Sequence, residues 1–353
     1  MTAEVSPSFF MGQAMRQQQA IPEFANVDAA TFHQEIVPLH RPVVMRGVVK
    51  QWPVVEHALR SPDAVCSYLK AFDTGVDVNA IMTPPGTGGQ VGYSEDLQGF
   101  SFVRNRLPLA AVITQLQRYL GADNAPSLAA QSALIAESIP GFLDEHRLSL
   151  LAASIQPRIW LGNTITVPAH FDEAHNIACC VSGRRRFTLF PPEQVGNLYV
   201  GPLEFTPAGA PVSMASADFD RFPRYREALA ASMVTELAPG DAVYIPAFWW
   251  HQVESIGTLN ILINYWWGGA IGMTERAGSP QNSLMHCLLH SLASMQGLSE
   301  GARAAWKAMF DHFVFDTDNA VAHIPAFRRG VLGELSEHDL RKLKDGLIVH
   351  LQQ

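Results

Sequence analysis

Residues 167–192 read VPAHFDEAHNIACCVSGRRRFTLFPP, a series of short β-rich runs that begins with a His-x-Asp pair. Alternate side chains of a β-strand point to the same face of its sheet, so His170 and Asp172 are expected to project together. Two ligands of one metal ion must be arranged in this way. The stretch therefore predicts a strand that carries part of a metal site.

A third candidate ligand comes from residues 239–267, which read PGDAVYIPAFWWHQVESIGTLNILINYWW. The PGD turn and the apolar run after it predict a strand that brings His251 to the start of the next one. Two imidazoles and one carboxylate on one face of a metal leave positions open, which suits Fe(II) better than structural zinc. The alternative for a lone histidine is a packed or surface side chain.

The pattern predicts a mainly β protein with helical additions. Short strand-like runs between Pro, Gly and Asn extend from about residue 155 to 269 and suit a small barrel or jelly roll. Apolar residues at three- and four-residue spacing predict helices within 107–153 and again after residue 280. We therefore expect N-terminal helical and β elements over 1–154, a core over 155–270 and a C-terminal helical region over 271–353.

Composition and charge argue against several classes of protein. Of the 353 residues, 48% are hydrophobic, which is enough for a sizeable core. The net charge is −8, and nucleic-acid binding is not expected because phosphate contacts need clustered cations. No apolar run predicts a membrane span, and the N-terminus has no secretory signal pattern. The four cysteines lack paired spacing, which indicates reduced thiols and a cytoplasmic protein.

Four motifs follow one another along the chain: HxDxxxN at 170–176, LFPP at 189–192, PGDxxYIPxxWWH at 239–251 and NYWW at 264–267. With residues 41–53, they resemble the cupin-like branch of the Jumonji C family of Fe(II)/2-oxoglutarate oxygenases. The motifs are especially similar to those of the asparaginyl hydroxylase that acts on hypoxia-inducible factor. The resemblance covers most of residues 30–270. It implies a double-stranded β-helix, the jelly-roll core of cupins, and a hydroxylase that uses Fe(II) and 2-oxoglutarate.

The resemblance also implies roles for particular side chains. His170, Asp172 and His251 would bind the iron. Arg185 matches the basic residue that holds the far carboxylate of 2-oxoglutarate, which a guanidinium can bind through two hydrogen bonds. Because Arg185 shares strand parity with Phe187, we expect it to point inward.

Two asparagines, Asn176 and Asn264, match residues that line the family's metal pocket and are expected to orient co-substrate or oxygen. A capping or turn role is the alternative for Asn176. The chain also departs from the family pattern, because Arg185 replaces a lysine, Val167 a threonine and Ser127, loosely aligned, a tyrosine. Two neutral donors are thereby lost, which leaves a different keto acid, a different pose or a site without turnover as alternatives.

Analogy with the family favours a protein or peptide substrate over a small molecule. The alternatives are a hydroxylase of a small metabolite, a non-catalytic metal-binding cupin that acts as a sensor or assembly partner, and an oxygen-independent isomerase. Residues 197–213 and 93–102 are predicted to form the substrate mouth. We expect His175 at the surface or mouth rather than as a fourth metal ligand.

The helices after residue 280 resemble the family's C-terminal dimerisation element. They predict a homodimer, with packing against the chain's own barrel as the alternative. The apolar positions concerned are Leu284, Leu288, Leu292, Trp306, Phe310 and Phe313. His286 and His290 lie one helical turn apart, but without a third ligand an exposed helix face is favoured over a metal pair. Most of the tryptophans at 249, 250, 266 and 267 are expected to be wall and core.

Overall fold

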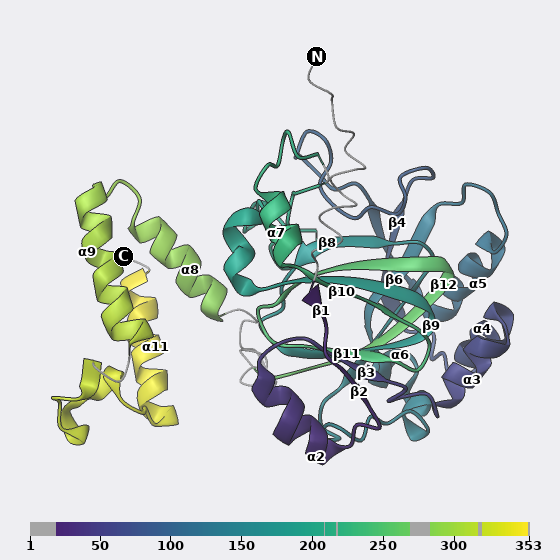
Figure 1. Cartoon of the computed structure of the whole chain (residues 1–353), viewed down its shortest axis with the longest axis horizontal. Coiled ribbons are helices and arrows are strands. Elements are labelled where there is room, and N and C mark those ends of the chain that lie inside the picture. Colours follow the sequence, from purple (N-terminus) through teal and green to yellow (C-terminus); the bar gives the residue numbers. More distant parts are fainter. Residues whose placement is uncertain (1–18, 208, 217, 269–282, 317–319, 352–353) are drawn as a thin grey trace. The chain divides into compact units, whose positions relative to one another are not determined.

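The computed structural model describes residues 19–207, 209–216, 218–268, 283–316 and 320–351. The chain divides into two compact units, with the boundary between Asn282 and Ser283. The described strands all belong to the first unit and form one sheet (Figure 1). They are β1 (Gln19–Ala20), β2 (Glu23–Ala25), β3 (Val43–Arg46), β4 (Asp77–Thr83), β5 (Val103–Pro108), β6 (Ser127–Leu134), β7 (Pro157–Gly162), β8 (Thr166–His170), β9 (His175–Phe190), β10 (Met233–Leu237), β11 (Ala242–Ile245) and β12 (Trp250–Trp267).

Two long antiparallel strands, β9 and β12, organise this sheet and pair along nearly their whole length. Each bends at a glycine with a left-handed backbone, Gly183 with φ +72° and Gly257 with φ +106°. A Cβ atom on Gly183 would lie 2.5 Å from the carbonyl oxygen of Leu259, so the close approach of the two strands requires a glycine there.

The bend divides the sheet into two facing layers. The larger layer runs in the order β2-β3-β11-β9-β12-β7-β6-β4-β5. In the smaller layer, β10 pairs with the second half of β9, β8 with the first half of β12, and β1 with β10. Apolar side chains from both halves of the long strands, such as Ala178, Phe187, Val253 and Leu262, pack together between the layers. This arrangement confirms the predicted jelly-roll core with helical additions.

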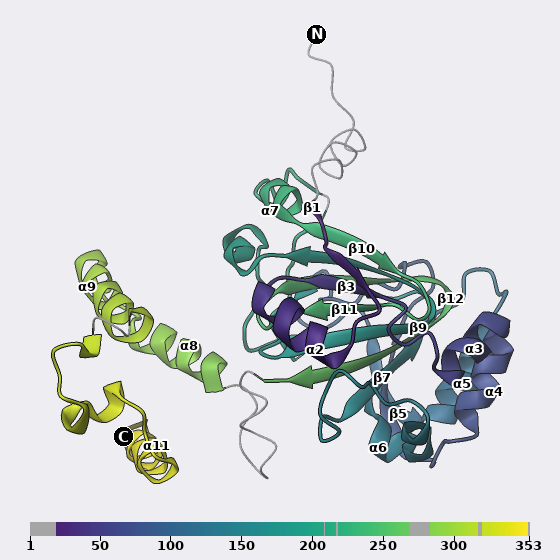
Figure 2. The same ribbon diagram turned by 60° about the horizontal axis from the view of Figure 1, so that its bottom comes forward.

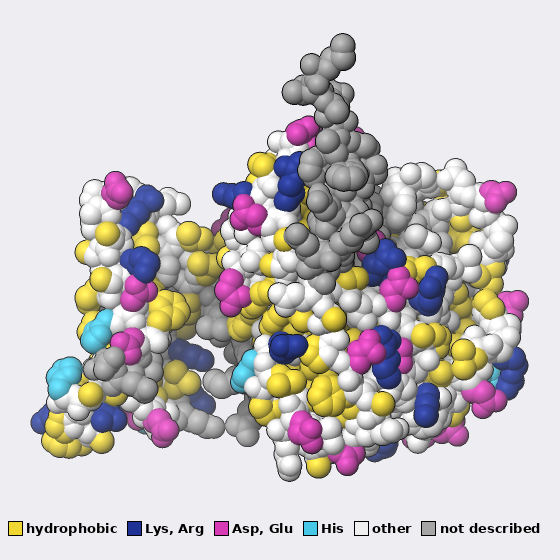
Figure 3. Space-filling model, viewed as in Figure 1, with side chains coloured by type: hydrophobic (Ala, Val, Ile, Leu, Met, Phe, Trp, Pro, Cys, Tyr) yellow, Lys and Arg dark blue, Asp and Glu magenta, His cyan; other side chains and the backbone are white. Residues whose placement is uncertain are grey.

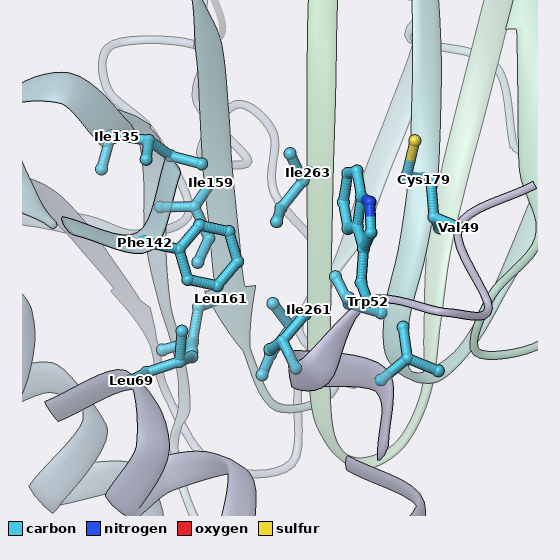
Figure 4. Packing of buried hydrophobic residues seen from close by; sticks show 14 of the residues in the cluster. Val49, Trp52, Leu69, Ile135, Phe142, Ile159, Leu161, Cys179, Ile261 and Ile263 are labelled. Carbon is cyan, nitrogen blue, oxygen red and sulfur yellow. The ribbon is translucent and has the colours of Figure 1, made fainter. Parts of the chain in front are cut away.

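Helices α3 (Pro53–Arg60), α4 (Pro62–Lys70) and α5 (Leu109–Tyr119) lie together beside the larger layer (Figures 1 and 2). In α5 the buried residues recur at the spacing that the sequence predicted, which directs one apolar face to the sheet. Figure 4 shows part of the resulting core, whose labelled residues include Trp52, Leu69, Ile135, Phe142, Ile159, Leu161, Ile261 and Ile263.

The helical prediction for 107–153 is wrong over part of its length. Helix α5 ends at Tyr119, and residues 127–134 form β6, which pairs with β4 on one side and β7 on the other. The alanines and leucines of β6 favour helix in isolation. Pairing with two neighbours and burial between them override that local preference. Only the short α6 (Ile135–Ser138) and a 3-10 turn at 140–144 follow before β7.

The remaining labelled α-helices are α2 (Ala29–Thr31) and α7 (Tyr225–Ala231) in the first unit, and α8 (Ser283–Ser294), α9 (Glu300–Phe310) and α11 (Glu337–Leu351) in the second. Among the described side chains of the second unit, only Ala320 is buried. Apolar side chains therefore stand on its surface (Figure 3). The side chain of Leu284 lies outside the described residues, and His286 and His290 are exposed as predicted.

None of the described helices combines the length and apolar character needed to cross a membrane.

Candidate metal centre

Three side chains converge at one end of the space between the two layers. His170 is the last residue of β8, Asp172 follows two residues later, and His251 is the second residue of β12. Antiparallel pairing of β8 with β12 places His170 directly opposite His251. One ligand atom from each of the three lies within 4.8 Å of the others, and His251 Nε2 is 3.6 Å from Asp172 Oδ2. This is the only such group of potential ligands in the described part of the chain.

Hydrogen bonds orient each of these side chains. The Nδ1 atom of His170 lies 2.9 Å from the carbonyl oxygen of Pro168, and His251 Nδ1 lies 3.0 Å from that of Trp249. A carbonyl oxygen can only accept, so each Nδ1 donates its proton. In the neutral ring this arrangement leaves the lone pair on Nε2, the atom that can then bind a metal.

The carboxylate is held from the larger layer. Trp266 Nε1 donates a 2.9 Å hydrogen bond to Asp172 Oδ2. The backbone of Asp172 is fixed as well, because its carbonyl oxygen accepts from the amide of Phe248, 2.8 Å away. Phe248 itself has φ +67°, a left-handed conformation that is uncommon outside glycine. The backbone is therefore strained immediately before the strand that carries His251.

Burial lowers the pKa of His170 to about 4, and the neighbouring His251 ring acts in the same direction. Asp172 and the Pro168 carbonyl oppose this shift without cancelling it. The His170 ring is therefore neutral at neutral pH. Neutral imidazole is the form that coordinates a metal, so the site needs no deprotonation of this ring before binding.

A cavity of about 130 Å³ lies beside the three side chains. Arg185 lines it from β9 and is buried, as the strand parity predicted. Its Nε atom has no hydrogen-bond partner within the described residues, and no carboxylate there lies within salt-bridge distance of its guanidinium. Burial lowers the pKa of Arg185 to about 10, which still leaves it charged at neutral pH. An unpaired buried cation is costly, so this cavity suits an anion.

The two predicted asparagines meet on neighbouring strands. Asn264 Nδ2 donates to Asn176 Oδ1 over 3.2 Å, and Trp160 Nε1 donates to Asn264 Oδ1 over 2.8 Å. All three residues line the cavity. Asn264 thus uses both ends of its amide within the protein, whereas no residue that the structure describes accepts a hydrogen bond from the amide nitrogen of Asn176.

Among the cavity residues that carry polar side-chain atoms, sequence reasoning missed two, Trp160 and Gln131. Trp160 lies in a predicted strand between Ile159 and Leu161, which pack on the helix side, so alternation alone could have assigned it inward. Gln131 fell in the segment predicted as helix, and no local signal placed it in the cavity. Ser127, which was loosely aligned with a donor, is not among the lining residues, so that alignment is not supported.

His175 differs from the expectation. Rather than standing free at the surface or mouth, it is half-buried and packs against the rings of Tyr244 and Trp267. Its Nδ1 lies 3.0 Å from Tyr244 Oη and accepts from the Ala247 amide at 3.4 Å. Burial, aided by His40, lowers the pKa of His175. It is a packing residue and not a fourth ligand of the group at His170.

The two segments predicted to form a mouth do lie together. The Phe100 and Phe205 rings stack with centroids 4.6 Å apart, and Tyr93 Oη donates to the carbonyl oxygen of Phe205 over 2.9 Å. Pro207 from one segment and Val91, just before the other, reach the cavity.

A sequence model of the cupin-like domain family matches residues 29–272. This chain belongs to the cupin-like domain family. Its relatives include lysine-specific demethylase JMJ31 of Arabidopsis thaliana, 33% identical over 130 residues, and Jumonji C domain-containing protein 5 of Drosophila melanogaster, 33% identical over 115 residues. These names agree with the Jumonji C resemblance found in the motifs.

HSPB1-associated protein 1 of Bos taurus is a further relative, 38% identical over 112 residues. The matched segments cover 36%, 32% and 31% of this chain for the Arabidopsis, Drosophila and Bos taurus proteins, respectively. They cover only 22%, 28% and 23% of those relatives. The chain thus shares about a quarter of the length of each relative.

Proposed function

We propose that this protein is an Fe(II)- and 2-oxoglutarate-dependent oxygenase that hydroxylates a side chain of a protein or peptide. The observation that supports this most strongly is the buried, unpaired Arg185 in the cavity that also holds His170, Asp172 and His251. A metal triad alone is shared by many cupin functions. The Arg185 cation in the same small cavity also favours a ligand with a carboxylate beyond the atoms that chelate the metal.

The residues that line the cavity fit both Fe(II) and 2-oxoglutarate. Two neutral imidazole nitrogens and one carboxylate, with no sulfur ligand, form a donor set typical of non-haem Fe(II) with positions left open. Arg185 would bind the far carboxylate of 2-oxoglutarate. When bound, iron and 2-oxoglutarate would supply oxidation by dioxygen, in which a C–H bond becomes C–OH and 2-oxoglutarate becomes succinate and carbon dioxide.

The protein's own contribution is orientation and exclusion of water. Trp266 fixes the Asp172 carboxylate, and the two backbone carbonyls fix the histidine rings. Asn176 has an amide nitrogen free to orient the co-substrate or oxygen, and Asn264 holds Asn176 in place. Most of the remaining wall is apolar, and dry walls strengthen the electrostatic contacts made inside.

We infer a protein or peptide target because the cavity's volume suits the co-substrate, so the target must reach it through the mouth at Phe100 and Phe205. The name of the Arabidopsis relative, a lysine-specific demethylase, also describes action on an amino-acid side chain. The free thiols of Cys66, Cys179 and Cys180 are buried, which fits the proposed cytoplasmic setting.

The proposal is tested by measuring succinate formed from 2-oxoglutarate by the Fe(II)-loaded protein without added target. Oxygenases of this kind turn over slowly in this uncoupled mode. We expect His170→Ala to lower the rate at least about 100-fold, because it removes a metal ligand. His286→Ala, an exposed histidine of the second unit, is the matched control and should match the wild type.

Succinate no higher than the His170→Ala background, with no visible charge-transfer band when 2-oxoglutarate is added without oxygen, would overturn the oxygenase proposal. The band without succinate would favour the non-catalytic sensor, for which the loss of a hydroxyl at Val167 is the supporting observation. Turnover of a substrate without oxygen would favour an isomerase.

A further inference from the structure

Few polar side chains of the cavity remain available to a bound molecule. Asn264 uses both ends of its amide, and the Trp160 indole donates to it. Val167 lines the cavity but offers no polar atom. Gln131 also lines the cavity, and its side chain makes no hydrogen bond within the described residues. Gln131 and Arg185 are therefore two donors that a ligand can use.

A β-bulge sets the position of Gln131. The register between β6 and β7 shifts so that two consecutive residues, Gln131 and Ser132, lie opposite the single residue Trp160. Ser132 has φ +51°, which residues other than glycine rarely adopt. Arg158 stabilises the bulge, since its Nη1 donates to the carbonyl oxygen of Ser132 at 3.0 Å and to Ser132 Oγ at 3.4 Å. Bulges beside functional sites commonly re-aim a side chain.

The bulge changes the alternation of β6 in a specific way. Ala129 packs near Val91 on the cavity side, and Gln131 follows on that same side. Ala130 and Ala133 both pack in the core on the helix side, although a regular strand would place them on opposite faces. The extra residue therefore lets Gln131 face the cavity while the alanines on both sides of it keep their contacts with the helix-side core.

Strand register places Gln131 toward the end of the cavity that contains Arg185. Trp160, opposite the bulge, pairs with Leu262, and Leu262 pairs with Cys180. Cys180 interacts electrostatically with Arg185. Gln131 thus lies in the row of residues that ends next to the buried cation.

Asn176 belongs to the opposite end, because it pairs with Trp266, whose indole holds Asp172. We propose that Gln131 donates a hydrogen bond to the far carboxylate of 2-oxoglutarate, alongside Arg185, and so replaces the neutral donors that Val167 cannot supply. This inference rests on the function proposed above. It makes Gln131 a determinant of specificity for a dicarboxylic keto acid.

The test is calorimetric binding of 2-oxoglutarate and of 2-oxobutyrate, which lacks the second carboxylate, to the full-length protein loaded with Mn(II). Gln131→Leu keeps the size of the side chain and removes the donor. We expect it to weaken 2-oxoglutarate binding about tenfold, the usual effect of losing one hydrogen bond to a charged group, and to leave 2-oxobutyrate unchanged. Gln131→Glu should weaken 2-oxoglutarate further, because two negative charges would face each other.

Gln51→Leu is the matched control, since it removes the same amide from an exposed glutamine that does not line the cavity; its 2-oxoglutarate affinity should equal that of the wild type. Equal affinity of wild type and Gln131→Leu for 2-oxoglutarate, or an equal loss for both acids, overturns the role of Gln131 while the oxygenase proposal stands. Absence of 2-oxoglutarate binding to the wild type itself overturns both. Thermal melting of each variant verifies that the fold is retained.

Discussion

At the scale of a single residue, Arg185 shows that a binding site can lower the stability of the folded protein. A guanidinium inside a protein loses its hydration, and here neither a carboxylate nor a hydrogen bond to Nε compensates within the described residues. Its neighbours in sequence behave differently, because Arg184 and Arg186 both pair with Glu236 at the surface. Of these three arginines, only Arg185 carries a buried charge without a partner among the described residues, as is expected of a cation that binds a ligand.

Replacing Arg185 by methionine is therefore expected to separate folding from binding. The free energy of unfolding of the ligand-free protein should stay level or rise by about 1 kcal/mol, because an unpaired buried charge is exchanged for an apolar side chain. Binding of 2-oxoglutarate should weaken at least about 100-fold, whereas metal binding should be unchanged. Urea unfolding and calorimetry measure the two effects.

The control for that experiment is Arg184→Met, which removes an exposed ion pair worth at most about 1 kcal/mol and touches no cavity residue. It should change neither measurement appreciably. A large loss of stability in Arg185→Met, accompanied by equal losses of metal and 2-oxoglutarate binding, would instead mean that Arg185 is structural.

At the scale of the elements, the sequence predicted parts of β9 and β12 as separate short runs and missed β6. Parity along β9 was enough to turn Arg185 inward. His170 and Asp172 also come together as predicted, but Asp172 lies two residues beyond the end of β8 and not on the strand itself. The bond from Trp266 to Asp172 could not be foreseen, because it joins strands whose register depends on the bends at Gly183 and Gly257. The residues of β6 are small and carry no period-two pattern, so only their partners on both sides define them as a strand.

The bends in β9 and β12 give a prediction about their glycines, Gly183 and Gly257. Gly183→Ala should lower the free energy of unfolding by about 3 kcal/mol, because a Cβ would meet the backbone of Leu259 and φ is +72°. Gly257→Ala meets nothing within 4 Å and should cost only about 1 kcal/mol of backbone strain. Urea unfolding of the two variants decides the matter, and equal losses would mean that close packing at the bend contributes nothing.

At the scale of the whole molecule, the second unit has many exposed apolar side chains. Small domains are stable only when they bury most of their apolar surface. Among the described residues of this unit, Ala320 alone is buried, while large side chains on α8, α9 and beyond are exposed, including Leu288, Leu292, Trp306 and Phe313. Apolar surface on this scale indicates an interface. We propose that a second copy of the chain covers it, as the resemblance implied.

The homodimer proposal predicts a mass of two chains by light scattering at micromolar concentration. Trp306→Glu should shift the protein to a single chain, because a carboxylate would be buried without a partner in the interface. Leu59→Glu is the matched control, since Leu59 is also an exposed apolar residue, on α3 of the first unit, and should leave the dimer intact. A wild type that is monomeric, or a Trp306→Glu variant that remains dimeric, would contradict the proposal. The first result would favour packing of these helices on the chain's own barrel.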